Sequence, residues 1–242
     1  MLNGKNAVIF DLDGTLIDSL GIWSNVDEQL VESLGRPDLA SDPGALARFR
    51  EEALVRHARE PNPYVGFCSD LAAFCASPLS GEEVHRERYR ISRTLLKTRV
   101  RLKPGASAFV NRLARLGFKL AIATTTKRAN IDIYANSNPH IAPELAFEQL
   151  FDAILTRENV SRIKPDPEIY QLALSTLGVS PAEALVFEDS LPGLQAAHAA
   201  GIETVVVRDP WSDADRDRLL KACDLYLESL LEAPDALGLS RL

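Results

Sequence analysis

The stretch that decides the fold spans residues 7–19, which read AVIFDLDGTLIDS. Its first four residues form a continuous apolar run, which is typical of a strand buried on both faces of a parallel sheet. Asp11 and Asp13 follow two residues apart, so both side chains point to the same side while the chain stays extended. Gly14 then permits a tight turn away from the sheet. We therefore expect a buried parallel strand that delivers two carboxylates to one edge of a sheet.

Similar short apolar runs recur along the rest of the chain and predict further strands. They cover residues 120–123, 153–155, 184–187, 204–207 and, more weakly, 224–227. Helices are predicted between them over residues 105–116, 167–177 and 192–200, because a Pro lies near each start and a Gly lies just past each end. Strand, helix and strand at this spacing imply right-handed crossover units. The expected fold is a layered α/β domain.

Residues 20–103 differ from this pattern, because they contain no clear buried-strand run. They predict helices over residues 22–34, 44–59, 65–76 and 81–99. Ser80 with Glu83 three residues later predicts a capping box at the start of the last helix. We expect an inserted helical domain over residues 19–101, with residues 1–18 and 102–242 forming the α/β core.

The composition of the chain argues against some classes of binding partner. The chain of 242 residues is 46% hydrophobic and carries a net charge of −7, which argues against a general nucleic-acid binder. Residues 45–101 alone hold 11 basic and 7 acidic residues; they could attract an anionic substrate or simply form solvated helix surfaces. No apolar run is long enough to span a membrane, and the first residues do not resemble a signal peptide. The expectation is a cytoplasmic protein, monomeric or homodimeric, that acts on a small molecule.

Polar residues stand where three predicted strands end. Thr124 follows residues 120–123, and Glu188 and Asp189 follow residues 184–187, as Asp11 and Asp13 follow the first strand. Because the carboxyl ends of parallel strands meet at one edge of a sheet, these side chains should converge there. Crowded carboxylates need positive charge, and oxygen ligands without His or Cys favour a hard cation such as Mg²⁺.

A lysine in a stiff loop completes the predicted site. Lys164 lies in RIKPDP, residues 162–167, where two prolines restrict the backbone. Carboxylates, a hard metal, a hydroxyl and a lysine together make a site for a phosphoryl group. Each element alone has an ordinary explanation: an aspartate at a turn, a threonine as a helix cap, a solvated lysine, or acidic residues beside a helix N-terminus. Their order at the ends of separate strands favours the functional interpretation.

These segments resemble the four motifs of the haloacid dehalogenase superfamily. Residues 10–19, FDLDGTLIDS, resemble the first motif, residues 121–124, AIAT, the second, and residues 164–167, KPDP, the third. Residues 187–190, FEDS, followed by Pro192 and Gly193, resemble the fourth. The resemblance covers nearly all of the core and implies a Rossmann-like, three-layer core with a parallel sheet. For an insertion at this place it implies an α-helical cap domain of the first type, as in the phosphoglycolate phosphatase and beta-phosphoglucomutase branch.

The resemblance also implies a role for each site residue. Asp11 would be the nucleophile, and Asp13 the general acid and base. Mg²⁺ would be held by Asp11, the main-chain oxygen of Asp13 and Asp189, with Glu188 acting through water. Thr124 and Lys164 would hold the phosphate oxygens. The implied activity is Mg²⁺-dependent hydrolysis of a small phosphorylated metabolite through an aspartyl-phosphate.

Two other functions remain open at this point. A phosphosugar mutase of the beta-phosphoglucomutase kind shares all four motifs, and a non-catalytic phosphometabolite-binding protein could use the same fold. Dehalogenase chemistry is disfavoured because Asp13 is present, and phosphonatase chemistry because Lys97 is the only lysine between Ser19 and Thr98. The residues that select the substrate are not predicted, and residues 130–148 form a longer connection than a helix and turn require.

Overall fold

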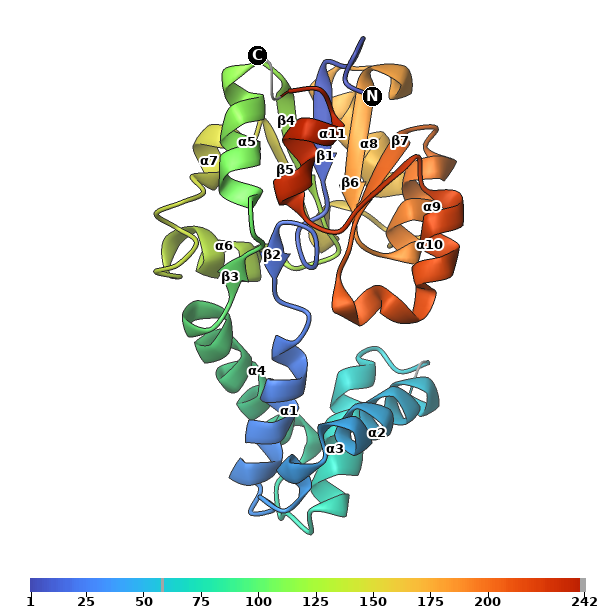
Figure 1. Cartoon of the computed structure of the whole chain (residues 1–242). Coiled ribbons are helices and arrows are strands. Elements are labelled where there is room, and N and C mark those ends of the chain that lie inside the picture. The colour runs from blue at the N-terminus through green and yellow to red at the C-terminus, as the bar shows by residue number, and fades with distance from the viewer. Residues whose placement is uncertain (58, 240–242) are drawn as a thin grey trace. The chain divides into compact units, whose positions relative to one another are not determined.

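The computed structural model describes residues 1–57 and 59–239 (Figure 1). The chain divides into two compact units. The core unit comprises Met1–Leu20 and Val100–Leu242, and the helical unit comprises Gly21–Arg99. The boundaries predicted from the sequence, residues 19 and 101, each differ from these by two positions.

The described part of the core unit contains a six-stranded sheet in the order β5-β4-β1-β6-β7-β8. All five neighbouring pairs are parallel, which confirms the predicted α/β class. The central strand β1 pairs with β4 on one side and with β6 on the other. The strands are β1 (Ala7–Phe10), β4 (Lys119–Ala123), β5 (Ala153–Leu155), β6 (Ala184–Glu188), β7 (Glu203–Val207) and β8 (Leu225–Leu227).

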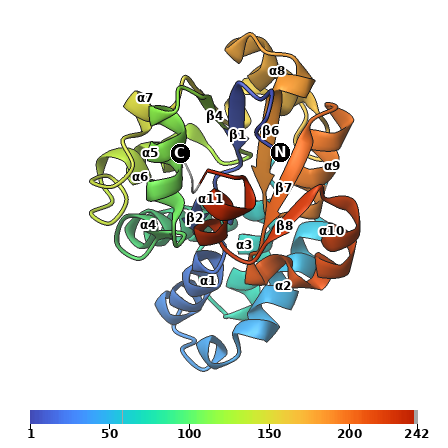
Figure 2. The ribbon, with the colours of Figure 1, turned by 45° about the horizontal axis from the view of Figure 1, so that its top comes forward.

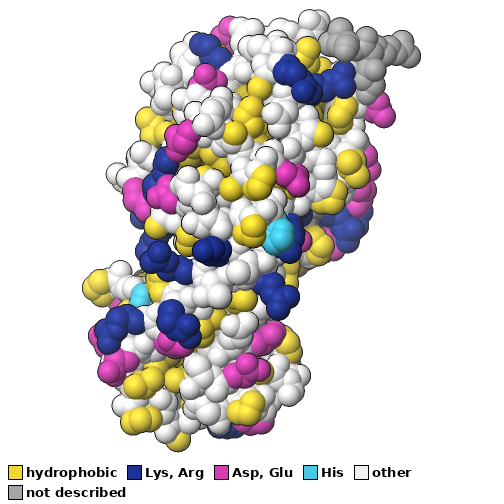
Figure 3. Space-filling model, turned by 90° about the vertical axis from the view of Figure 1, so that its left-hand side faces the viewer, with side chains coloured by type: hydrophobic (Ala, Val, Ile, Leu, Met, Phe, Trp, Pro, Cys, Tyr) yellow, Lys and Arg dark blue, Asp and Glu magenta, His cyan; other side chains and the backbone are white. Residues whose placement is uncertain are grey.

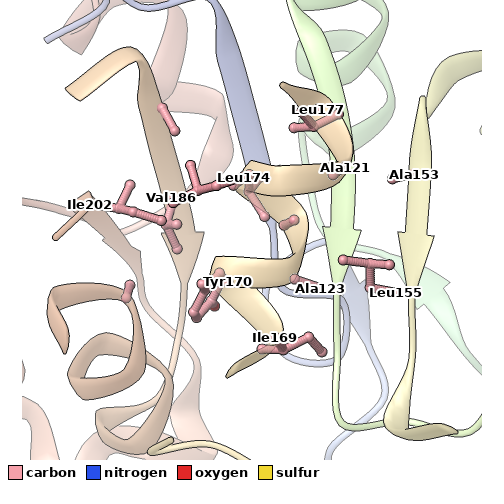
Figure 4. Packing of buried hydrophobic residues seen from close by; sticks show 14 of the residues in the cluster. Ala121, Ala123, Ala153, Leu155, Ile169, Tyr170, Leu174, Leu177, Val186 and Ile202 are labelled. Atoms are coloured by element: carbon pink, nitrogen blue, oxygen red, sulfur yellow. The ribbon is translucent and has the colours of Figure 1, made fainter. Parts of the chain in front are cut away.

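Helices cover both faces of the sheet, which gives the expected three layers (Figure 2). Helices α8 (Glu168–Leu177) and α9 (Leu191–Ala199) pack on one face, where Ala7 and Ile9 of β1 join their apolar side chains. Figure 4 shows Tyr170 and Leu174 of α8 in this cluster. Phe10 points to the opposite face and meets Phe109 of α5 (Ala106–Arg115), with ring centroids 6.1 Å apart. Because β1 is buried on both faces, its residues are apolar without alternation.

The remaining elements of the core unit are short. A ribbon of β2 (Ile17–Asp18) and β3 (Arg101–Leu102) is antiparallel and lies where the chain leaves and re-enters this unit; it is too short to be predicted from the sequence. The other helices are α6 (Arg128–Asn136), α7 (Phe147–Leu150), α10 (Arg216–Ala222) and α11 (Ala233–Ala236). The 3₁₀ helices are η2 (Arg157–Asn159), η3 (Pro181–Glu183), η4 (Pro210–Asp215) and η5 (Leu230–Glu232).

The connection over residues 130–148 differs in part from its prediction. The sequence suggested that a helix restarts at residues 142–144, after the break at residues 136–139. The structure has turns there, and the next helix, α7, begins only at Phe147. Asn138 is buried and its side-chain oxygen accepts the backbone N–H groups of His140 and Ile141, which stabilises the turn in place of a helix.

The helical unit consists of four α-helices and the 3₁₀ helix η1 (Leu39–Ser41) in its described part. The α-helices are α1 (Ile22–Ser33), α2 (Pro43–Arg56), α3 (Pro63–Phe74) and α4 (Gly81–Thr98). The predicted capping box of Ser80 and Glu83 is confirmed. The predicted end of the second helix, residue 59, lies beyond its observed end at Arg56, and residue 58 lies outside the described residues.

Much of the positive charge of the helical unit is paired. Buried Asp27 accepts hydrogen bonds from Arg50 at 2.5 Å and Arg88 at 2.9 Å, and Arg90 pairs with Glu87 at the surface. Figure 3 shows basic and acidic side chains interspersed on one face of the molecule. In the part of the chain that is described, no helix is both long and apolar enough to cross a membrane.

Candidate active site

Loops at the carboxyl edge of the sheet bring the predicted site residues together. Asp11 directly follows β1, Thr124 follows β4, Glu188 is the last residue of β6, and Asp189 comes next. The backbone N–H of Asp11 donates to the carbonyl of Phe187 at 2.9 Å, so the pairing of β1 with β6 continues to the point where the carboxylates emerge. The parallel sheet therefore fixes the spacing of the first and fourth motifs.

Lys164 connects the carboxylates. Its Nζ atom donates to Asp11 Oδ1 at 2.6 Å, to Glu188 Oε1 at 2.6 Å and to the Ala123 carbonyl at 2.9 Å. The side chain is only 5% exposed. Burial opposes a charge on this ammonium group, but Asp11 and Glu188 outweigh it and raise the pKa of Lys164 above its usual value. The lysine is therefore a fixed positive charge.

Both oxygens of Glu188 are occupied by the protein itself. Besides Lys164, Oε1 accepts the hydroxyl of Tyr170 at 2.6 Å, and Oε2 accepts the Asp189 N–H and the Ser190 hydroxyl, each at 3.1 Å. Gly193 allows this approach, because a Cβ atom there would lie 1.9 Å from the carboxyl carbon of Glu188. With these contacts, the carboxylate of Glu188 anchors Lys164.

Asp189 is held from two other loops. Its Oδ1 accepts the hydroxyl of Thr15 at 3.2 Å, and its Oδ2 accepts the hydroxyl of Ser212 at 3.3 Å. Gly14 passes directly over the carboxylate with φ +90°, and a Cβ atom there would lie 2.4 Å from Oδ2. Any side chain at Gly14 would therefore displace Asp189 as well as strain the turn.

Asp11, Glu188 and Asp189 form an acidic cluster, because each offers an oxygen within 4.8 Å of the others. Burial raises the pKa of Asp11 to about 7 despite the opposing charge of Lys164, and Glu188 contributes further. Burial, followed by the charges of Glu188 and Asp11, raises the pKa of Asp189 well above its ordinary value. The single positive charge of Lys164 therefore does not balance the negative charges of the three carboxylates in the acidic cluster.

The chemistry of the donor set fits a divalent cation. Among the described residues, the acidic groups at this edge include Asp11, Asp13, Glu188, Asp189 and Asp209, and Lys164 and half-buried Lys103, which is paired with Asp209, carry positive charge. When all of them are ionised, the negative charges outnumber the positive ones. A bound cation would offset this excess, and oxygen donors without nitrogen or sulfur suit a hard divalent cation.

The structure places the Asp13 side chain outside the acidic cluster. Asp13 Oδ1 accepts the hydroxyls of Ser19 at 2.5 Å and Tyr134 at 3.3 Å, and Oδ2 accepts the hydroxyl of Thr126 at 2.5 Å. Burial, followed by the charge of Asp13, raises the pKa of Tyr134 well above its usual value, so this phenol stays a donor. The three hydroxyls fix the orientation of the carboxyl group.

Thr124 is buried beside this arrangement. Its Oγ1 accepts the N–H of Thr126 at 3.1 Å, and within the described residues its own hydroxyl proton has no acceptor. Three residues of this site, Thr126, Tyr134 and Tyr170, are not predicted from the sequence. The run ATTTK at residues 123–127 offered a signal for Thr126. The two tyrosines lie inside helices, where no sequence signal separated them from core residues.

Comparison with known proteins agrees with this geometry. The sequence model of the haloacid dehalogenase-like hydrolases matches residues 5–201. A phosphorylated carbohydrates phosphatase from Thermotoga maritima is 32% identical, covering 82% of this chain and 83% of the relative. The putative phosphatase YhcW of Bacillus subtilis is 34% identical, covering 98% of this chain and 97% of the relative.

A solved structure of a putative beta-phosphoglucomutase from Thermotoga maritima superimposes with a TM-score of 0.72 at 29% identity, covering 96% of this chain and 98% of that one. The matched family region contains Asp11, Thr124, Lys164 and Asp189, the side chains that the sheet edge brings together. This chain is an enzyme of the haloacid dehalogenase-like hydrolase family.

Proposed function

We propose that the chain is a Mg²⁺-dependent phosphatase that hydrolyses a small phosphorylated metabolite through an aspartyl-phosphate on Asp11. The observation that carries the proposal is the position of Lys164, whose Nζ lies 2.6 Å from both Asp11 and Glu188. A buried lysine held against the nucleophile offsets the repulsion between an anionic carboxylate and an anionic phosphate. The hard-cation chemistry of the acidic cluster supplies the second positive charge.

The residues proposed to hold Mg²⁺ are Asp11 and Asp189 through their carboxylates and Asp13 through its main-chain oxygen. Glu188 was expected to act through water. Its five hydrogen-bond donors, among them both the N–H and the hydroxyl of Ser190, support a different main role, the anchoring of Lys164. When bound, Mg²⁺ neutralises charge between the carboxylates and the phosphoryl oxygens.

The proposed reaction has two steps. In the first, a carboxylate oxygen of Asp11 attacks phosphorus, the bond to the ester oxygen breaks, and protonated Asp13 gives its proton to the leaving oxygen. In the second, Asp13 removes a proton from a water molecule that attacks the same phosphorus, which frees phosphate and regenerates Asp11. Thr124 and Lys164 hold phosphoryl oxygens in both steps. Ser19, Thr126 and Tyr134 keep Asp13 oriented.

The proposed substrate is a phosphorylated carbohydrate or a metabolite of similar size, as the name of the Thermotoga phosphatase suggests for that relative. We also propose that residues 1–18 and 102–242 form the catalytic core and residues 19–101 a cap domain. Phosphosugar mutase activity is the second candidate, favoured by the structural likeness to the putative beta-phosphoglucomutase. A non-catalytic role is disfavoured, because Asp11, Asp13, Lys164 and Asp189 are all present.

Phosphate release from an aryl phosphate and from a panel of sugar phosphates tests the proposal. We expect release that requires Mg²⁺, stops when EDTA is added and returns when Mg²⁺ is restored in excess. The same panel, followed by ³¹P NMR, distinguishes the second candidate. Interconversion of sugar-phosphate isomers without net phosphate release would establish a mutase, and a protein inert toward every ester with Mg²⁺ present would refute both.

A further inference from the structure

A second buried ion pair lies at the same edge of the core unit, outside all four motifs. Lys103 Nζ donates to Asp209 Oδ2 at 2.5 Å and to the Arg208 carbonyl at 3.3 Å. The Lys103 side chain is 11% exposed and that of Asp209 is fully buried. Burying two charges is costly, so such a pair needs an explanation beyond its own attraction.

Asp209 organises the loop that reaches the acidic cluster. It follows β7, its Oδ1 accepts the Trp211 N–H at 2.8 Å, and its carbonyl accepts the Ser212 N–H at 3.0 Å, which starts η4. The hydroxyl of Ser212 then donates to Asp189 Oδ2 at 3.3 Å. One continuous set of contacts therefore leads from Lys103 to a proposed cation ligand.

The carboxylate of Asp209 also acts on Asp189 through its charge, because the single residue Ser212 contacts both Asp209 and Asp189. Negative potential at Asp189 favours a bound cation. In a poorly solvated site such charge interactions are weakly screened.

Lys103 ties the pair to the ribbon at the unit boundary. It directly follows β3, and its backbone N–H donates to the carbonyl of Leu16 at 2.8 Å, next to β2. The lysine thus has a fixed backbone as well as a fixed side chain. Its positive charge is held where it offsets the negative charge of Asp209.

We propose that the Lys103–Asp209 pair sets how tightly the acidic cluster holds its divalent cation, with Asp209 strengthening cation binding and Lys103 limiting it. The inference rests on the proposed function in naming Mg²⁺ as the cation. Both are positioning residues, because they act through Asp189 and its loop.

The test measures Mg²⁺ affinity without turnover, from the unfolding midpoint of the full chain at increasing Mg²⁺ concentration and pH 8. Asp209→Asn keeps a side-chain oxygen that can cap Trp211 but removes the charge. We expect its Mg²⁺ affinity to be about tenfold weaker, because a divalent ion loses one nearby negative charge in a weakly screened site. Lys103→Gln leaves the carboxylate without its counter-charge, and we expect tighter binding than in the wild type.

The opposite signs separate this account from a purely structural role, which predicts weaker binding in both variants. Unchanged affinity in Asp209→Asn, or unchanged or weaker affinity in Lys103→Gln, would overturn the proposal. Asp213→Asn is the matched control, because Asp213 lies in η4 but pairs with Arg208 at the surface, and its affinity should stay within about twofold of the wild type.

If a single variant fails to fold, the double variant Lys103→Gln/Asp209→Asn keeps the question open to experiment, because it leaves no buried charge unpaired. We expect the two opposite effects to cancel to within about threefold, since neighbouring charges couple. A larger weakening would contradict the proposal. Absence of Mg²⁺ binding by the wild type would instead refute the proposed function, and the inference with it.

Discussion

Asp11→Asn is expected to lower kcat for phosphate release by at least about 10⁴-fold, the size of loss found when a catalytic group of a covalent mechanism is removed. An amide oxygen can still accept the hydrogen bond of Lys164, but it does not attack phosphorus as a carboxylate does. Burial raises the pKa of Asp11 to about 7, so removing this charge should not destabilise the fold. Steady-state phosphate release and the thermal unfolding midpoint measure the two effects separately.

Asp132→Asn is the control for this prediction. Asp132 lies on α6 of the same unit. Its side chain is 50% exposed and pairs with Arg128 at 2.9 Å on the helix surface. The same chemical change there should leave kcat within about twofold, because exposed ion pairs contribute little. Residual activity in Asp11→Asn close to that of the control would mean that Asp11 is not the nucleophile.

Lys164→Met is expected to reduce both activity and stability. Asp11 and Glu188 would lose the positive charge that both of them contact, and breaking a buried pair in this way costs about 3–5 kcal/mol. The transition state would also lose a charge that we propose holds phosphoryl oxygens, for which we expect a loss in kcat of about 10²–10³. Urea unfolding measures the loss in the free energy of unfolding, and phosphate-release kinetics at saturating Mg²⁺ measure the loss in kcat.

The double variant Lys164→Met/Glu188→Gln separates these effects. Glu188→Gln removes the carboxylate that is left unpaired, so the free energy of unfolding should recover in part. The activity should not recover, because the charge beside Asp11 is still missing. Recovery of activity together with stability would show that Lys164 has only a structural role.

The sheet, and the fact that the motifs lie together at one of its edges, could be predicted from the sequence. The apolar runs of β1, β4 and β6 determine which residues end each strand, and parallel pairing brings Asp11, Thr124 and Asp189 to one edge. Lys164 could be added because prolines restrict its loop. These are effects of local sequence combined with one general rule of sheet topology.

The contacts that complete the site depend on packing that the sequence pattern does not encode. Tyr170 reaches Glu188 only because of the rotation of α8 on the sheet, and Lys103 meets Asp209 from 106 positions away. The anchoring role of Glu188 likewise depends on donors from separate elements. The ribbon of β2 and β3 has two residues in each strand, fewer than any periodic pattern requires.

The proposed function depends on phosphate being carried transiently on Asp11, and this aspartyl-phosphate can be trapped chemically during turnover. Borohydride added during turnover reduces an aspartyl-phosphate to homoserine, and peptide mass spectrometry then locates the altered residue. We expect homoserine at position 11, only when substrate and Mg²⁺ are both present, and none at position 13. Reduction at any other residue, or steady turnover with position 11 always intact, would contradict it.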